Sequence, residues 1–239
     1  MANYIKNIGK VVCIGRNYVD HIKELNNMAP AQPFFFLKPT SSIVQPQDSD
    51  AKILIPKGTD VHYEVELALI MGKTYKNVSL TSDPKADLAK AIDAIDSYAL
   101  AIDLTARNVQ AEAKKKGLPW SIAKGFDTFL PLSNQTISKN IIKDPHKVFL
   151  QLDVNGKTHQ ADSTELMIFQ IPRILSTISS IMTLQPGDIV LTGTPKGVGP
   201  IVPGDKVKAT LSYDGAVIPE ATIELDVAQK DGPYVFAQT

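Results

Sequence analysis

The most informative segment of this chain is the run Val61-His62-Tyr63-Glu64-Val65-Glu66-Leu67-Ala68-Leu69-Ile70-Met71. Its content of Val, Leu, Ile and Tyr predicts a β-strand, in which residues two apart point to the same face. Glu64 and Glu66 therefore project side by side, and their like charges repel unless a cation neutralises both. The alternative is a half-exposed strand with both glutamates in water. That alternative weakens after Leu67, where both faces of the run become apolar.

A third carboxylate ends a second apolar strand, expected at residues 98–104. Asp103 comes just before Thr105, which we expect to cap the following helix. The junction of a buried strand and a helix is a common position for a ligand or a catalytic acid. Three carboxylates without Cys or His at matching spacing suit a hard divalent ion, so the sequence predicts a Mg²⁺ site, with Mn²⁺ or Ca²⁺ as alternatives.

The whole chain has the composition of a globular protein, with 239 residues and a hydrophobic fraction of 44%. Lys+Arg and Asp+Glu are equal at 25 each, so no net field attracts nucleic acid or an acidic membrane surface. The single cysteine, Cys13, excludes an internal disulfide and is expected in the core. No apolar run is long enough to span a bilayer and no signal-peptide pattern is evident, so we expect one cytoplasmic domain over residues 1–239.

Strand signals outnumber helix signals, and the helices fall between unlike strands without regular βαβ alternation. This order predicts an α+β fold built on a mixed sheet sandwich or roll. Asn155-Gly156 predicts a hairpin turn, and the second half reads as antiparallel. Strands are expected at 11–14, 34–37, 53–55, 61–71, 98–104, 148–154, 189–191, 207–211 and 222–225, and helices at 17–25, 83–97, 106–116 and 172–182.

Candidate catalytic groups accompany the carboxylates. His21 and Glu24 are three residues apart, hence on one face of a helix, where the carboxylate can orient the imidazole as a general base for water. Arg107 and Gln110 have the same spacing on the helix after Asp103 and can face whatever the metal holds. Each of these groups is also compatible with an ordinary solvated helix surface.

Two further segments fit a substrate site. Lys124 lies among apolar residues, where a positive charge can stabilise a developing oxyanion. Residues 193–200 hold three glycines and two prolines, which impose a rigid turn whose backbone can approach a ligand closely. A purely structural turn explains this loop equally well when it is taken alone.

The ordered set of these segments resembles the fumarylacetoacetate hydrolase superfamily, in its small single-domain branch of acylpyruvases and oxaloacetate-processing enzymes. The resemblance runs through Gly15-Arg16-Asn17-Tyr18-Val19-Asp20-His21, Phe36-Leu37-Lys38-Pro39, His62-Tyr63-Glu64-Val65-Glu66, the segment 103–110, Lys115-Lys116-Gly117-Leu118-Pro119-Trp120, and Lys124 to the segment 191–199.

The resemblance implies a role for each candidate residue. It implies that the Mg²⁺ ligands are Glu64, Glu66 and Asp103, and that His21 and Glu24 form a base dyad on a mobile lid. It implies that Lys124, Arg107 and Gln110 surround the substrate oxygens. Thr194 would contact the substrate carboxylate through its loop. It also implies a homodimer. The larger members carry a further amino-terminal domain and a fourth acidic ligand where this chain has Asn17, which argues against fumarylacetoacetate as substrate.

The expected reaction is the hydrolysis of a 3-acylpyruvate to a carboxylate and pyruvate, through a pyruvate enolate held by Mg²⁺. Decarboxylation or keto–enol tautomerisation of oxaloacetate at the same site is the alternative, because all three reactions share the enolate. A metal-binding β domain without catalysis is a third possibility. It accounts for the carboxylates but not for His21, Glu24 or Lys124.

Overall fold

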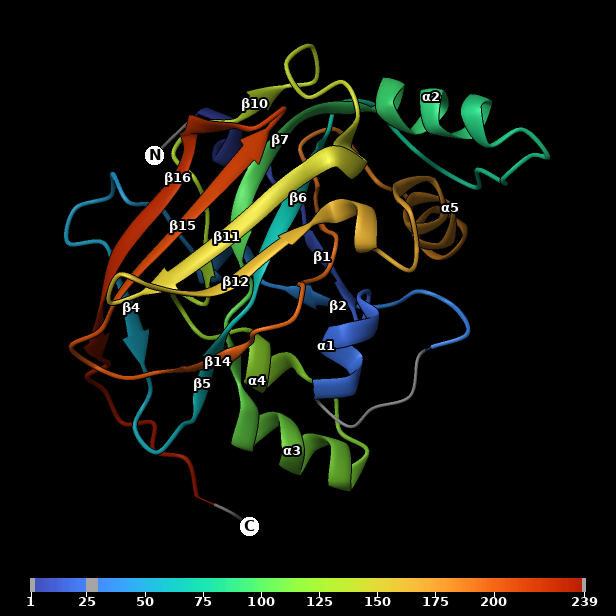
Figure 1. Ribbon diagram of the computed structural model, residues 1–239. Helices are drawn as coiled ribbons and strands as arrows, with labels where there is room; N and C mark the ends of the chain where they lie inside the picture. Colours follow the sequence, from blue (N-terminus) through green and yellow to red (C-terminus); the bar gives the residue numbers. More distant parts are fainter. Residues whose placement is uncertain (1–2, 25–29, 238–239) are drawn as a thin grey trace.

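A computed structural model describes residues 3–24 and 30–237 of the chain (Figure 1). Its helices are α1 Val19–Glu24, α2 Pro84–Ala94, α3 Arg107–Lys116, α4 Ser121–Lys124 and α5 Ile171–Ile181, with short 3-10 turns at Asn3–Asn7, Thr40–Ser42, Pro145–Lys147 and Thr164–Leu166. No helix in these two stretches is both long and apolar enough to cross a membrane.

Within the described part, the strands form two large sheets and two small ones. The first large sheet has the order β10 Ile137–Ser138, β7 Ile95–Ile102, β6 Val65–Met71, β13 Ile189–Leu191, β1 Val11–Gly15 and β2 Phe34–Lys38. The second has the order β12 Lys157–Ser163, β11 Val148–Val154, β15 Lys206–Tyr213, β16 Ala216–Gln229 and β4 Lys52–Ile55. The small sheets are β14 Gly199–Ile201 with β5 Val61–Tyr63 and β8 Thr105–Ala106, and β3 Ile43–Val44 with β9 Leu130–Pro131.

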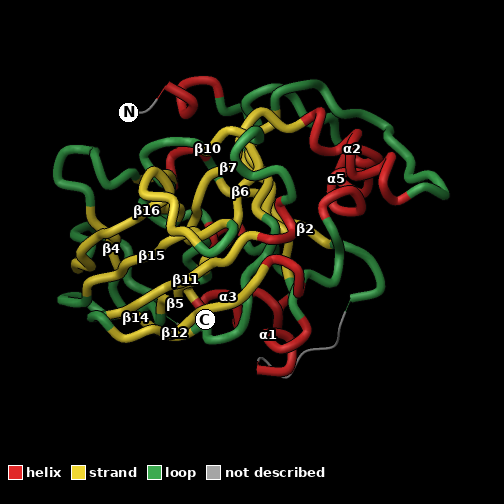
Figure 2. The backbone as a smooth tube through the Cα atoms, turned by 45° about the horizontal axis from the view of Figure 1, so that its top comes forward, coloured by secondary structure: helices red, strands yellow, loops and turns green. Residues whose placement is uncertain are grey.

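The two large sheets pack face to face, with β11 against β6 and with β15 and β16 against β7 (Figures 1 and 2). Most neighbouring strands are antiparallel, while β1 with β13 and β16 with β4 are parallel. The helices α2 and α5 contact each other and lie at one end of the sandwich (Figure 1). The predicted α+β class with a mixed sheet sandwich is therefore confirmed, as is the antiparallel second half.

Strand β6 is buried on both faces, because each face enters a different apolar cluster. Leu67 and Leu69 belong to the main core between the two large sheets, whereas Ala68 and Ile70 belong to a second cluster on the opposite face. Residues of a strand alternate between faces, so Glu66 shares the face of Ala68 and Ile70. The predicted alternative, a strand with this face in water, is wrong.

Several predicted boundaries are wrong for tertiary reasons. The expected single strand 61–71 breaks at Glu64, because β5 pairs with β14 and β8 while β6 pairs with β13 and β7. The expected helix 83–97 ends at Ala94, after which Ile95 starts β7. Thr105 does not cap α3. Thr105 lies in β8, and the N-cap residue of α3 is Ala106, whose side chain forms no capping hydrogen bond.

Other local predictions are confirmed. The helix α3 ends at Gly117, whose φ of 65° is the left-handed conformation typical of a helix stop. Asn155 and Gly156, both with positive φ, form the turn between β11 and β12. Cys13 is fully buried in the second apolar cluster. The expected helix 17–25 is observed as the shorter α1, which begins only at Val19, and residue 25 lies outside the described residues.

Candidate active site

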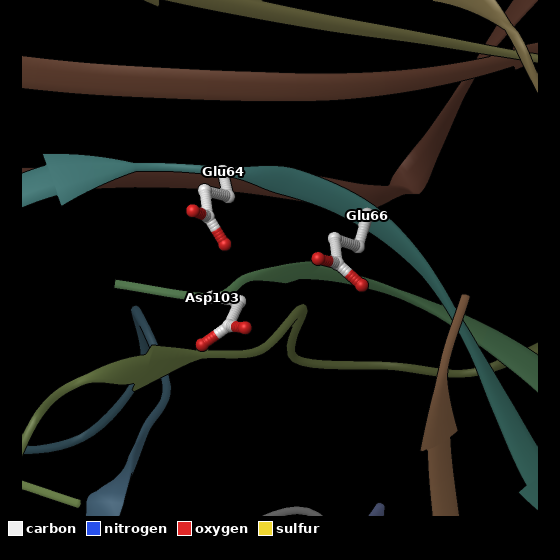
Figure 3. Close-up of side chains that lie close together, drawn as sticks. All are labelled: Glu64, Glu66 and Asp103. Atoms are coloured by element: carbon white, nitrogen blue, oxygen red, sulfur yellow. The ribbon is translucent and has the colours of Figure 1, made fainter. Parts of the chain in front are cut away.

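The three predicted carboxylates come together in one buried cluster. Glu64, Glu66 and Asp103 each offer an oxygen atom, and these atoms lie within 4.8 Å of one another. The glutamates hang from the same side of the β5–β6 segment, and Asp103 follows β7 on the neighbouring ribbon (Figure 3). The Asp103 amide donates a 2.8 Å hydrogen bond to the Glu64 carbonyl, which fixes the end of β7 against the break between β5 and β6.

Three cations surround the carboxylate cluster. Lys124 Nζ lies 3.0 Å from Glu64 Oε2 and 2.7 Å from Asp103 Oδ2. Arg107 forms an ion pair with the other oxygen of Glu64. Lys38 Nζ lies 2.6 Å from Asp103 Oδ1. Burial of so many charges is tolerated because each cation has an acidic partner.

Glu66 differs from the other two carboxylates. Its Oε2 accepts a 2.7 Å hydrogen bond from the Gly193 amide, and no cation among the described residues lies within 4 Å of it. Burial, followed by the charges of Asp103 and Glu64, raises its pKa well above the usual range. Burial also opposes the charge of Glu64, but Lys124 and Arg107 outweigh it and hold the pKa of that carboxyl well below the ordinary value.

The donor set fits a divalent metal ion. An all-oxygen cluster suits Mg²⁺, Mn²⁺ or Ca²⁺, and a carboxylate can accept a metal while it keeps its hydrogen bonds. Glu66 has no ion-pair partner among the described residues, and a bound cation would supply one. With three carboxylates set against three cations, a divalent ion would make the centre positive and suited to an anionic substrate.

Lys124 is held by the short helix α4, an element without a clear sequence signal. Its side chain is 2% exposed, and Nζ lies 4.6 Å from the centroid of the Phe36 ring. Burial pulls the pKa of Lys124 down, but the carboxylates of Asp103 and Glu64 outweigh it and leave the pKa raised. Lys124 therefore places a positive charge beside Glu64 and Asp103.

His21 and Glu24 lie close to each other on α1 but are not hydrogen-bonded. His21 Nδ1 is 3.8 Å from Glu24 Oε2 and has no hydrogen-bond partner in the described part of the chain. Glu24 instead accepts from the Gly197 amide at 2.9 and 3.0 Å. Burial lowers the pKa of His21 below 6.5, so the imidazole is neutral at pH 7.

The remaining predicted residues line the same pocket. Arg107 Nη1 donates to Gln110 Oε1 at 3.2 Å, which matches the expected three-residue spacing. Thr194 Oγ1 donates to the Val65 carbonyl at 2.8 Å and accepts from Gln160. The predicted set that lines the pocket is His21, Glu64, Glu66, Asp103, Arg107, Gln110, Lys124 and Thr194; Glu24 borders His21 from outside.

Three residues that support this pocket have no assigned role in the sequence prediction. Lys38 ends the apolar strand β2, a signal that parallels Asp103 at the end of β7. Asn17 donates to the Thr192 carbonyl at 2.8 Å and ties α1 to the strand before the glycine-rich loop. Gln160 accepts from the Val65 amide at 2.9 Å; no local pattern predicts this contact because the two residues are far apart in sequence.

A mixed α+β sandwich with a buried acidic triad ringed by cations defines the architecture of a small-molecule enzyme. The chain belongs to the fumarylacetoacetate hydrolase family, since the family described as Fumarylacetoacetate (FAA) hydrolase C-terminal matches residues 10–224. Several of its relatives are named as enzymes that act on oxaloacetate. "Oxaloacetate tautomerase oaa1, mitochondrial" of Schizosaccharomyces pombe is 56% identical over 85% of this chain and 88% of that protein. "Oxaloacetate decarboxylase, mitochondrial" of Dictyostelium discoideum is 45% identical over 85% and 88%.

Solved structures agree with this membership. The crystal structure of yeast ynq8, a fumarylacetoacetate hydrolase family protein, has a TM-score of 0.87 and 43% identity over the whole of both chains. Fumarylpyruvate hydrolase from Pseudomonas aeruginosa, in complex with Mn²⁺ and pyruvate, has a TM-score of 0.79 and 27% identity over 93% of this chain and 91% of that one.

Proposed function

We propose that this protein is a divalent-metal-dependent oxaloacetate tautomerase that interconverts the keto and enol forms, with decarboxylation of the same acid as the alternative. The observation that carries the proposal is the buried triad of Glu64, Glu66 and Asp103 ringed by cations. The relatives named as oxaloacetate tautomerases and decarboxylases support this choice of substrate. This order reverses the sequence-based expectation, in which acylpyruvate hydrolysis came first.

The position of Glu24 also supports tautomerisation over hydrolysis. Hydrolysis needs an activated water, and we expected the His21–Glu24 dyad to supply it. Glu24 Oε2 lies 3.8 Å from His21 Nδ1, and both Glu24 oxygens accept from the Gly197 amide. A neutral, unoriented imidazole is sufficient to move a proton of the substrate itself.

The metal would be held by Glu64, Glu66 and Asp103, and when bound it supplies a Lewis acid that polarises a 2-oxo group and acidifies the C3 protons. Lys124 and Arg107, the cations paired with Glu64, stabilise the negative charge that develops on the 2-oxygen. His21 accepts the proton from C3 and returns it to that oxygen, so no atom is gained or lost. Gln110 offers an amide donor to the substrate, and Thr194 holds the loop beside it through the Val65 carbonyl.

The test is a direct measurement of keto–enol interconversion. Purified protein with Mg²⁺ should accelerate the decay of enol absorbance of oxaloacetate in the ultraviolet, and EDTA should abolish the acceleration. Pyruvate formation from oxaloacetate and bleaching of acetylpyruvate measure the two competing reactions on the same sample. The proposal fails if acetylpyruvate is cleaved rapidly while oxaloacetate tautomerises at the buffer rate.

A charge variant connects this activity to the site. Lys124→Met removes a cation that lies within 3.0 Å of two of the carboxylates, and loss of one such stabilising group typically costs ~10²- to 10³-fold in kcat. Lys115→Met is the matched control, because Lys115 is exposed on α3 and does not line the pocket. Equal activity of the two variants would remove Lys124 from the mechanism.

Location and assembly are also open to measurement. The names of the relatives place them in mitochondria, whereas the sequence led us to expect the cytoplasm. We propose a mitochondrial location by this similarity, and cell fractionation tests it. The homodimer and the single domain over residues 1–239 stay predictions, which sedimentation and limited proteolysis test respectively.

A further inference from the structure

Two cations at the pocket have no role in the mechanism above. Arg16 follows β1, and Lys114 lies in the last turn of α3, yet both line the same pocket as the carboxylate triad. Lys114 belongs to the basic run 114–116 in the last turn of α3, where positive charges complement the helix dipole. Its neighbour Lys116 does pair within α3, with Glu112 at 2.7 Å, whereas Lys114 faces the pocket.

Each of these cations lies over an aromatic ring. The Arg16 guanidinium carbon is 5.5 Å from the centroid of the Phe34 ring, and Lys114 Nζ is 5.2 Å from the centroid of the Trp120 ring. Phe34 and Trp120 contact each other edge to face, with centroids 5.8 Å apart. The two rings therefore form a continuous platform that holds both cations in place and keeps water from one side of them.

Neither cation has an ion-pair partner within 4.0 Å in the part of the chain that the structure describes. Lys114 is exposed in part; desolvation of the remainder, followed by the positive charges of Arg16 and Arg107, lowers its pKa, so these charges repel one another. Arg16 also has a φ of 56°, a left-handed conformation that is unfavourable for a residue with a Cβ. Backbone strain is concentrated at functional sites, and an anion would relieve the repulsion between like charges that have no ion-pair partner among the described residues.

We propose that Arg16 and Lys114 bind the distal carboxylate of a short 2-oxo diacid, so that they determine the specificity of the pocket for a dicarboxylate. The inference rests on the proposed function, which assigns the 2-oxo acid end to the triad and the cations around it. An arginine and a lysine on a rigid platform suit a second carboxylate, because the anion relieves their mutual repulsion. A neutral distal group, such as the methyl ketone of acetylpyruvate, leaves that repulsion in place.

This pair also discriminates between the two reactions of oxaloacetate. In tautomerisation a proton moves from C3 to the 2-oxygen and the C4 carboxylate keeps its charge. In decarboxylation the C3–C4 bond breaks, its electron pair forms the enolate, and C4 leaves as neutral CO₂. Contacts to the C4 carboxylate are retained through the first transition state and weaken in the second, so they favour tautomerisation.

The experiment compares ligands that differ only in the distal carboxylate. Malate and lactate share a 2-hydroxy acid, and neither is consumed in the assay. Calorimetric titration of the Mg²⁺-loaded protein should show that malate binds about 10- to 100-fold more tightly than lactate. Arg16→Gln and Lys114→Met should each reduce this preference at least about tenfold, while Lys115→Met should retain it. Lactate affinity should stay within about threefold in all variants.

The outcomes separate the two proposals. A wild-type protein that binds malate and lactate equally, or variants that keep the wild-type preference, would overturn the role of Arg16 and Lys114. If malate is preferred and the variants lose the preference, but oxaloacetate does not tautomerise, only the proposed function fails. Lys114 is exposed on α3, so its replacement leaves the fold intact even if Arg16→Gln unfolds the protein. In active enzyme, Lys114→Met should also raise the ratio of decarboxylation to tautomerisation; an unchanged ratio would contradict the pair's part in selecting the reaction.

Discussion

Replacing Glu66 by glutamine should stabilise the metal-free protein and remove its response to metal. Glu66 is 1% exposed, lies beside two other carboxylates and has no cation within 4 Å among the described residues. The amide keeps the shape of the side chain and can still accept the hydrogen bond from Gly193. The substitution therefore removes a buried charge without opening a cavity or leaving a donor unpaired.

Two free energies bound the stabilisation expected from Glu66→Gln: the repulsion between neighbouring carboxylates and the cost of protonating Glu66. Like charges within 4.8 Å of each other repel by at least about 3.5 kcal/mol at an effective dielectric constant of about 20, and Lys124 offsets part of this repulsion for Glu66. Protonating a carboxylate with an ordinary pKa of 4.5 at pH 7 costs about 3.4 kcal/mol. The buried charge cannot destabilise the folded state by more than this, because the carboxylate would then bind a proton instead. We expect Glu66→Gln to raise the free energy of unfolding by about 1–3 kcal/mol, which corresponds to a rise of roughly 2–12 °C in Tm.

Thermal unfolding in EDTA and in Mg²⁺ measures both parts of this prediction. Mg²⁺ at about 100 times its Kd should stabilise the wild type by about 2.7 kcal/mol and should leave Glu66→Gln unchanged. Glu220→Gln is the control, because Glu220 is exposed on β16 and should shift stability by less than about 0.5 kcal/mol in either buffer. A lower Tm for Glu66→Gln in EDTA, or a full response of that variant to Mg²⁺, would refute the reasoning.

Three further predictions concern the residues around the triad. Lys38→Met should lower the free energy of unfolding in urea by about 3 kcal/mol, because it leaves one oxygen of the buried Asp103 without its cation. An unchanged free energy of unfolding would contradict that pairing. Gly197→Ala should lower Tm and activity together, since φ is 91° and a Cβ would lie 2.0 Å from the His159 carbonyl oxygen; an unchanged Tm would exclude the clash. The pKa of His21 is lowered from 6.5, so its neutral form persists below that pH, and kcat/KM should fall only as pH drops through a value under 6.5. An acid limb at or above 6.5, or one retained in His21→Ala, would argue against His21 as the base.

The carboxylate triad is predictable because its signal is local. Glu64 and Glu66 share a face by strand alternation, and Asp103 marks the end of an apolar strand, so both features are evident within a few residues. Among the three cations, Lys38 is a different case from Lys124 and Arg107, which the sequence itself singles out. Lys38 reaches Asp103 only because β2 joins the large sheet through β1. Pairing across a sheet depends on the whole topology, so the sequence has no local pattern for it.

The same limit explains the errors in boundaries and in the base dyad. The break at Glu64 is set by which strands pair with β5 and β6, and strands of two or three residues such as β8 and β14 have no periodicity to detect. His21 and Glu24 have the expected helical spacing, yet Glu24 bonds to Gly197, 173 residues along the chain. Local spacing predicts which residues are near each other but not which partner each one takes.

Trp120 is the only tryptophan in the chain, and it lies in the pocket wall between Phe34, Phe36 and Lys114. Its indole emission therefore comes from one known place, with no second indole to obscure it. An anion that draws Lys114 away from the ring would change the local field and the quenching of that emission. The protein thus carries a built-in optical reporter, and stopped-flow fluorescence of unlabelled material can time ligand entry separately from proton transfer.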